Sequence, residues 1–120
     1  MKIDYLYRLP KFPIIGVIDD WLVTAPSAAV FERRLGKVTL APDARYNIID
    51  STGELWDFYS SKNYIVPTMR RKWSKKKIVQ TYNQSSNCTQ VGEAYSEKSL
   101  SAKRFELVFA DILALVERSQ

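Results

Sequence analysis

A chain of 120 residues, 46% of them hydrophobic and 12% aromatic, has enough apolar material for one ordinary core, so we expect a single domain over residues 1–120. No apolar run approaches the ~18 to 20 residues of a membrane span, and residues 1–13 contain no apolar segment of a secretory signal, so we expect a cytoplasmic protein without a membrane partner. The single cysteine, Cys88, excludes an internal disulfide.

The net charge of +5 is divided unevenly along the chain. Residues 1–60 carry seven basic and eight acidic side chains, whereas residues 61–120 carry eleven basic and five acidic ones. No acidic residue occurs between residues 61 and 92, and the cations of that interval are Lys62, Arg70, Arg71, Lys72, Lys75, Lys76 and Lys77. An electrostatic partner is therefore expected to bind there.

The first quarter of the chain predicts strands. The alternation of apolar and polar residues over 2–9 predicts a half-buried strand, which Pro10 ends. Its buried face would consist of Ile3, Tyr5, Tyr7 and Leu9. Residues 14–23 are rich in β-branched and aromatic side chains and predict one or two further strands, interrupted by a solvated turn at Asp19-Asp20.

A short helix is predicted next, over residues 26–35. Pro26 lies near its first turn, where a proline is tolerated, and Gly36 is placed for the C-terminal cap. The helix separates the first strands from those that follow.

A hairpin is the most clearly predicted pair of strands. Residues 46–50 and 55–59 flank the turn Asp50-Ser51-Thr52-Gly53, in which Asp50 is expected to be the turn-forming residue. Residues 63–69 predict a further strand, and Pro67 favours an edge position or a strand end.

The next segments predict a helix and a loop. Residues 75–83 form a helix that Ser74 can cap, and Trp73 and Ile78 have the spacing of a hydrophobic staple across its first turn. Residues 84–99 are polar and predict a loop.

Residues 102–118 predict the clearest helix of the chain. One broad apolar arc of this helix is wide enough to pack across a sheet. Its members are Phe105, Val108, Phe109, Ile112, Leu113, Leu115 and Val116. A weaker stripe of Leu107, Ala110 and Ala114 is either filler or a second contact surface, for a partner helix or a second copy of the chain. We therefore predict an α+β fold, with a mainly antiparallel sheet of about four to six strands and the C-terminal amphipathic helix packed on one face.

Few residues are candidates for catalysis. Without histidine no Ser-His or Cys-His dyad can form, and Cys88 lies in a polar segment without an activating group, so we expect an inert thiol. Zinc sites built on Cys and His are excluded by residue count and no glycine-rich phosphate loop occurs, so we expect no metal and no cofactor. An enzyme that uses Asp19 or Asp20 with a second carboxylate is a third possibility, but we expect a protein without catalytic residues.

The segment 70–77 combines cations with the start of a helix. Lysines at positions 75 to 77 occupy the first turn, where the positive end of the helix dipole normally attracts acidic residues, so helix stability does not explain them. Together with the free N–H groups they would create a positive potential that favours anions. We predict a partner-binding site that consists of Arg70, Arg71, Trp73, Lys75, Lys76 and Lys77. A solvated surface, an anionic protein surface and nucleic acid are the three interpretations of this basic patch.

Three stretches resemble segments of small cytoplasmic immunity proteins from bacterial contact-dependent growth inhibition and other polymorphic-toxin systems. They are Gly53-Glu54-Leu55-Trp56, Ile65-Val66-Pro67 and the run from Lys72 to Asn83. The resemblance implies a non-catalytic protein that binds one cognate toxin domain and covers its active site or another essential surface. Many such toxins are basic nucleases with acidic inhibitors. A basic inhibitor implies either a toxin with an acidic surface or recognition through the acidic N-terminal half, around Asp19, Asp20, Asp50 and Asp57.

The leading prediction is thus a protein-binding module of the immunity type, a toxin inhibitor whose oligomeric state the sequence leaves open. The alternative is a small nucleic-acid-binding accessory protein that uses the same patch, although the chain contains no helix-turn-helix, RNP or zinc-finger signature. The two differ in salt dependence, because binding to phosphates weakens steeply as the salt concentration rises.

Overall fold

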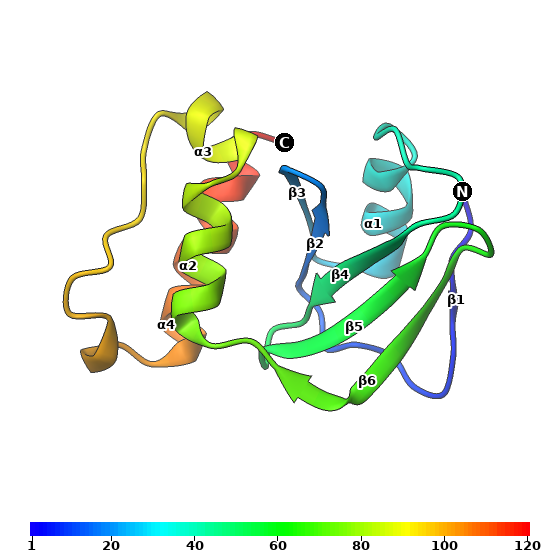
Figure 1. The fold of residues 1–120 in the computed structure, drawn as a ribbon, viewed down its shortest axis with the longest axis horizontal. Helices are drawn as coiled ribbons and strands as arrows, with labels where there is room; N and C mark the ends of the chain where they lie inside the picture. Colours follow the sequence, from blue (N-terminus) through cyan, green and yellow to red (C-terminus); the bar gives the residue numbers. More distant parts are fainter.

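The computed structural model describes all of residues 1–120, which form one six-stranded sheet and four α-helices (Figure 1). The strand order is β1-β6-β5-β4-β2-β3, and all neighbouring pairs are antiparallel except β1 and β6, which are parallel. The strands are β1 (Asp4–Tyr5), β2 (Ile14–Ile18), β3 (Trp21–Ala25), β4 (Arg45–Ile49), β5 (Glu54–Tyr59) and β6 (Tyr64–Lys72). This arrangement confirms the predicted α+β fold with a mainly antiparallel sheet.

The helices cover both faces of the sheet. They are α1 (Ala28–Leu35), α2 (Lys75–Asn83), α3 (Ser86–Val91) and α4 (Phe105–Glu117), with a 3-10 turn, η1 (Leu100–Ala102), before α4. In Figure 1, α2 and α4 lie side by side at one end of the molecule, and α1 lies across the sheet from them. None of these helices has the length and apolar character required to cross a bilayer.

The cap of α2 agrees with the predicted start at Ser74, whereas α1 begins two residues later than predicted, so that Pro26 lies before the cap rather than in the first turn. The hydroxyl groups of Ser27 and Ser74 accept hydrogen bonds from the N–H groups of Val30 and Lys77, respectively. These bonds satisfy donors that have no partner inside the first turn of a helix. Gly36 follows α1 as expected, but it has a right-handed conformation with φ of −62°.

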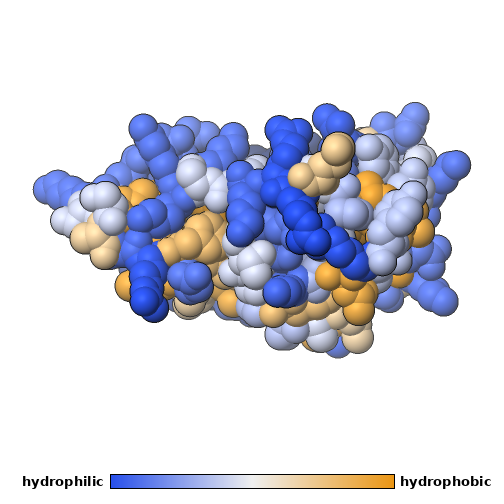
Figure 2. Space-filling model, turned by 90° about the horizontal axis from the view of Figure 1, so that it is seen from below, coloured by the Kyte–Doolittle hydropathy of each residue, from blue (hydrophilic) through white to orange (hydrophobic).

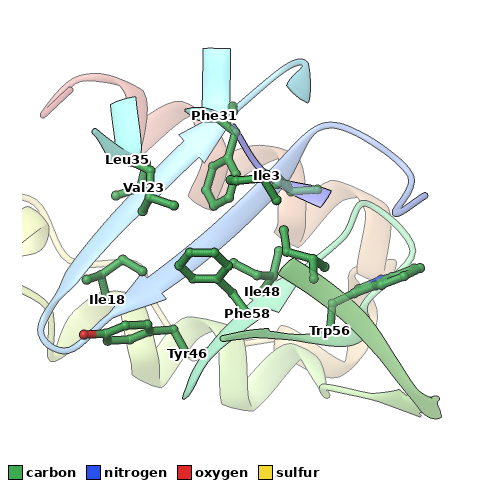
Figure 3. Close-up of a cluster of buried hydrophobic side chains, with 12 residues drawn as sticks. Ile3, Ile18, Val23, Phe31, Leu35, Tyr46, Ile48, Trp56 and Phe58 are labelled. Atoms are coloured by element: carbon green, nitrogen blue, oxygen red, sulfur yellow. The ribbon is translucent and has the colours of Figure 1, made fainter. Parts of the chain in front are cut away.

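The first core lies between the sheet and α1. It forms because alternate residues of each strand point to the same face, as with Ile48 of β4 and Phe58 of β5. Figure 3 shows Phe31 of α1 directed toward this pair, whereas Leu35 of α1 lies beside Val23 of β3. Gly16 of β2 permits the close approach, since a Cβ atom there would lie 3.1 Å from the ring of Phe31.

The second core lies on the opposite face, under α2 and α4. Ile78, Val79 and Tyr82 of α2 are buried there, as predicted from their spacing. The buried residues of α4 belong to the predicted apolar arc: Val108, Phe109, Ile112, Leu115 and Val116. The C-terminal helix therefore packs on one face of the sheet, as expected. The weaker stripe of Leu107, Ala110 and Ala114 is exposed and does not take part in either core.

The turn between β4 and β5 is built around a buried carboxylate. Asp50 is 1% exposed and accepts hydrogen bonds from five donors: the backbone N–H groups of Lys11, Thr52 and Glu54, the hydroxyl of Thr52, and Nε1 of Trp56. Gly53 closes the turn with φ of +86°, a conformation that glycine adopts without strain. Asp50 is therefore the turn-forming residue that the sequence predicts.

The predicted strand over residues 2–9 is wrong beyond Tyr5. β1 pairs with only Tyr64 and Ile65 of β6, and the chain then leaves the sheet. Tyr7 has φ of +74° and is 90% exposed, and Leu9 is 62% exposed, so neither side chain joins the face of Ile3. The alternation of apolar and polar residues could not reveal that the chain leaves the sheet after Tyr5. The course of residues 6–9 depends on the short pairing of β1 with β6 and on the ion pair of Arg8 with Glu54, and both are contacts with distant residues.

The polar stretch 84–99, predicted as a loop, contains α3. The hydroxyl of Ser85 caps this helix by accepting from the N–H of Cys88, and Gly92 ends it with φ of +77°. The helix lacks an apolar stripe because its fully buried residue is Asn87, whose side chain bonds the backbone of β3. Apolar periodicity therefore could not reveal it.

Candidate binding surface

The predicted site residues occupy two connected elements. Arg70 and Arg71 belong to the end of β6, where both are exposed, and the lysines begin α2 after the short connection at Trp73 and Ser74. The structure thus places the basic segment along one continuous stretch of surface. Its members differ in what their charged groups contact.

Lys75 has a structural contact. Its Nζ donates hydrogen bonds of 2.9 Å to the carbonyl of Leu100 and 2.6 Å to the carbonyl of Lys103. It therefore joins the start of α2 to the segment that leads into α4. This contact explains a cation in the first turn of a helix, which the dipole alone would disfavour.

Trp73 is half-buried, and its ring packs against the core under α2 and α4. The Nζ of Lys77 lies 5.2 Å from the centre of this ring, within the range of a cation–π contact. Since the ring packs against this core and Lys77 lies over the ring, the position of Trp73 is that of a staple rather than of an open stacking platform. Lys76 is exposed and has no partner within the chain.

The end of β6 is distorted by a bulge opposite β5. The register shifts between Glu54 and Trp56, so the partner of Glu54 is Lys72 and the partner of Trp56 is Pro67. Met69 and Arg70 have φ of +59° and +62° within this bulge, and Met69 is 95% exposed. Non-glycine residues adopt this left-handed region rarely, at a cost of about 1 kcal/mol or more each.

The segment after β1 lies beside this bulge and was not part of the predicted site. The guanidinium of Arg8 pairs with the carboxylate of Glu54 through both of its terminal nitrogens and lies 4.6 Å from the centre of the Trp56 ring. The hydrogen bonds that the Arg8 guanidinium donates to the carboxylate of Glu54 raise the pKa of Arg8 above its ordinary value. Tyr7 and Leu9, on either side of Arg8, are therefore held in exposed positions on a fixed segment.

A hollow of about 530 Å³ separates residues 8–11 from the end of β6. Its polar lining consists of Arg8, Lys11, Thr52, Glu54, Arg70 and Lys72, and Leu9 is its one hydrophobic residue. Four cations and one carboxylate thus face the hollow, which gives its lining a net charge of +3. We use the name β6 surface for the region formed by this hollow and the side chains around it. Its members are Tyr7, Arg8, Leu9, Lys11, Met69, Arg70, Arg71 and Lys72.

The cations of the β6 surface other than Arg8 have no acidic partner. The chain contains three ion pairs, Arg8–Glu54, Arg34–Glu117 and Arg118–Glu93, and none includes a cation of residues 62–77. Figure 2 views the molecule from the side on which β6 lies in Figure 1, and it shows strongly hydrophilic side chains across the middle of this face with hydrophobic residues next to them. The surface therefore combines free positive charge with exposed apolar groups.

Protection of a sheet edge explains part of this composition. Beyond Ile65, β6 has no strand neighbour on its outer side, and positive charge, proline and bulges all keep such an edge from pairing with other chains. That role accounts for the lysine and arginine residues and for Pro67. It does not account for Met69, because a bulge would be formed with less strain by glycine and an exposed methionine does not protect an edge.

A second hollow, also of about 530 Å³, lies at the other end of the sheet between α1 and β3. Arg33 and Lys37 contribute unpaired cations to it, while Arg34 pairs with Glu117. The hydrogen bonds from Arg34 and Thr24 hold the pKa of Glu117 below its usual value. None of the residues that line this hollow has a positive φ, so it lacks the strained backbone of the β6 surface.

The acidic residues and Cys88 were the remaining candidates for catalysis or metal binding. Asp19 and Asp20 are exposed in the turn between β2 and β3, and Asp20 accepts a hydrogen bond from Ser86. No three side chains of the types His, Cys, Asp and Glu come together as a metal site. Cys88 is half-buried in α3, and its Sγ lies 3.6 Å from the carbonyl of Glu93. The predicted solvated turn at Asp19-Asp20 is confirmed.

Comparisons of the chain with protein-family models, with curated proteins and with solved structures found no match.

Proposed function

We propose that this protein is a non-catalytic binding protein that recognises an acidic surface of a partner protein through the β6 surface. The observation that carries the proposal is backbone strain at exposed side chains. Tyr7, Met69 and Arg70 all have positive φ, and the first two are 90% and 95% exposed. Strained residues cluster at ligand-binding and other functional sites.

The charge of the surface indicates the chemistry of the partner. The side chains of Lys11, Arg70 and Lys72 form no ion pair within the chain, so carboxylates of a partner could bind them without breaking an existing one. Apolar side chains next to these cations fit the mixture of apolar and polar contacts in protein interfaces, where arginine, methionine and tyrosine are enriched.

The specific role that we propose is that of an immunity protein, which neutralises a cognate toxin domain. The segments that resemble immunity proteins contribute the start of β5, the first half of β6, its last residue, Lys72, and the whole of α2. These elements border the β6 surface, so the resemblance and the strained backbone point to the same part of the molecule. The toxin domain would present an acidic surface.

A binding experiment tests this role. A large secreted protein encoded next to this chain would supply the toxin domain, and calorimetry would measure its affinity for wild-type protein and for the double variant Arg70→Glu/Arg71→Glu. We expect the double variant to bind at least about a hundredfold more weakly, because attractive contacts become repulsive. Arg33→Glu/Lys37→Glu makes the same change of charge at the second hollow and is expected to bind normally.

Two results would contradict the proposal. The first is equal loss of affinity in both double variants, which would show that binding follows net charge alone. The second is binding of random-sequence DNA or RNA at low salt that disappears steeply as salt rises, because this dependence is typical of phosphate contacts.

A further inference from the structure

We propose that the hollow of the β6 surface binds an acidic peptide segment, in which neighbouring Asp or Glu side chains of the partner enter between residues 8–11 and the end of β6. This inference rests on the proposed function, because it assigns a ligand class to one part of the proposed interface. Its starting observation is the composition of the hollow, in which all but one of the lining residues are polar or charged.

The fixed Arg8–Glu54 pair leaves the other cations of the hollow free. Glu54 is 6% exposed and its carboxylate is fully engaged by the guanidinium of Arg8, so it is not available to neutralise Lys11, Arg70 or Lys72. The buried carboxylate of Asp50 bonds the backbone N–H of Lys11 and leaves the ammonium group of that residue free. Three like charges around one hollow repel one another, and an entering anion removes this repulsion.

The walls of the hollow favour carboxylates over a nucleobase or an apolar small molecule. A volume of about 530 Å³ is large enough for a small molecule, but sites for such ligands are lined mainly by hydrophobic side chains, whereas Leu9 is the one hydrophobic residue here. A base needs an aromatic face on which to stack, and none of the residues that line the hollow is aromatic. Carboxylates need only N–H donors, which the guanidinium of Arg70 can supply in pairs.

The test is a titration of the full chain with an end-blocked octa-glutamate peptide at low ionic strength, followed by backbone amide NMR. We expect chemical-shift changes at Lys11, Thr52 and Lys72. The double variant Lys11→Gln/Lys72→Gln should raise the Kd by about tenfold or more, because it removes two charged hydrogen bonds. The matched control is Arg33→Gln/Lys37→Gln, which lowers the net charge equally and should change the Kd by less than about twofold. Thermal unfolding of each variant verifies that it is folded.

Three outcomes would overturn the inference: no binding of octa-glutamate, equal weakening in the two double variants, or equally tight binding of an oligothymidylate of the same charge with the same shifts. The single variant Arg71→Glu separates this inference from the proposed function, since Arg71 does not line the hollow. If octa-glutamate does not bind but Arg71→Glu still weakens binding of the toxin domain, the peptide site is wrong and the protein interface is retained. If Arg71→Glu also has no effect on the toxin domain, the proposed function is wrong as well.

Discussion

The side-chain amide of Asn87 takes the place of a neighbouring strand beside Leu22. The backbone N–H of Leu22 donates to Oδ1 of Asn87 at 2.7 Å, and Nδ2 of Asn87 donates to the carbonyl of Leu22 at 3.0 Å. Gln120 and Arg34 bond the remaining outward-facing groups of β3 at Leu22 and Thr24. The outer edge of β3 is thus closed by side chains, whereas the outer edge of β6 is left open beyond Ile65.

Replacing Asn87 should destabilise the fold. Asn87→Leu removes both bonds to Leu22 and a third to the hydroxyl of Ser119, and it leaves the buried N–H of Leu22 without an acceptor. We expect the free energy of unfolding to fall by about 2 to 4 kcal/mol, measured by urea denaturation. The exposed neighbour variant Gln90→Leu serves as a control and should change it by less than about 0.5 kcal/mol. A loss of less than about 1 kcal/mol in Asn87→Leu would show that water or another group replaces the amide.

The lysines at the start of α2 should differ in their effects on stability. Lys75→Ala removes two hydrogen bonds from a charged donor to the carbonyls of Leu100 and Lys103, and should cost about 1 to 2 kcal/mol. Lys76→Ala removes an exposed cation from the positive end of a helix, so it should leave stability unchanged or raise it by a few tenths of a kcal/mol. Thermal unfolding of the two variants compares them directly, and equal effects would contradict the structural role of Lys75.

The ion pair of Glu117 with Arg34 should contribute to stability in a pH-dependent manner. Because hydrogen bonds from Arg34 and Thr24 lower the pKa of Glu117, the pair stabilises the fold above the ordinary pKa of 4.5. This stabilisation is lost as the pH falls through the lowered pKa of Glu117 in the folded protein. Glu117→Gln should therefore reduce the steepness of the loss of stability below about pH 4.5, relative to wild type.

The control for that variant is Glu97→Gln, because Glu97 is exposed and has no ion pair. Urea denaturation at several pH values from about 3 to 7 would compare the three proteins. Identical pH dependence of wild type and Glu117→Gln would show that the pair does not form in solution.

Features that depend on neighbours in sequence could be predicted. The cap at Ser74 and the turn at Asp50 require residues only two to four positions away, and both are present. The apolar arc of α4 was also predicted, because burial follows directly from its period.

Features that join distant residues could not be predicted in this way. Arg8 and Glu54 are 46 positions apart, and their pair determines both the course of residues 6–11 and the form of the hollow. Asn87 and Leu22 are 65 positions apart, so only the folded chain shows that the polar helix at residues 86–91 places Asn87 against β3. The basic run is visible in the sequence, but the hydrogen bonds of Lys75 to Leu100 and Lys103 join it to a distant part of the chain and appear only in the fold.

The central claim is that strain in the β6 surface is kept because the strained side chains bind a partner. The most direct test measures both the unfolding free energy and the affinity for the proposed partner, a toxin domain, in the variant Met69→Gly. Glycine adopts the φ of +59° without strain, so the substitution removes the strain of the folded state. Glycine also raises the conformational entropy of the unfolded chain, which opposes folding. We expect the relief of strain to be the larger effect and the free energy of unfolding to rise by about 0.5 kcal/mol.

Met69→Ala is the matched control, since alanine removes the same side chain but retains the strained backbone. The account predicts that Met69→Gly is more stable than wild type and binds the toxin domain about tenfold more weakly, because a side chain that is 95% exposed in the free protein becomes buried in the interface. Wild-type affinity in Met69→Gly would contradict the account, because the strained side chain of Met69 would then make no contribution to binding.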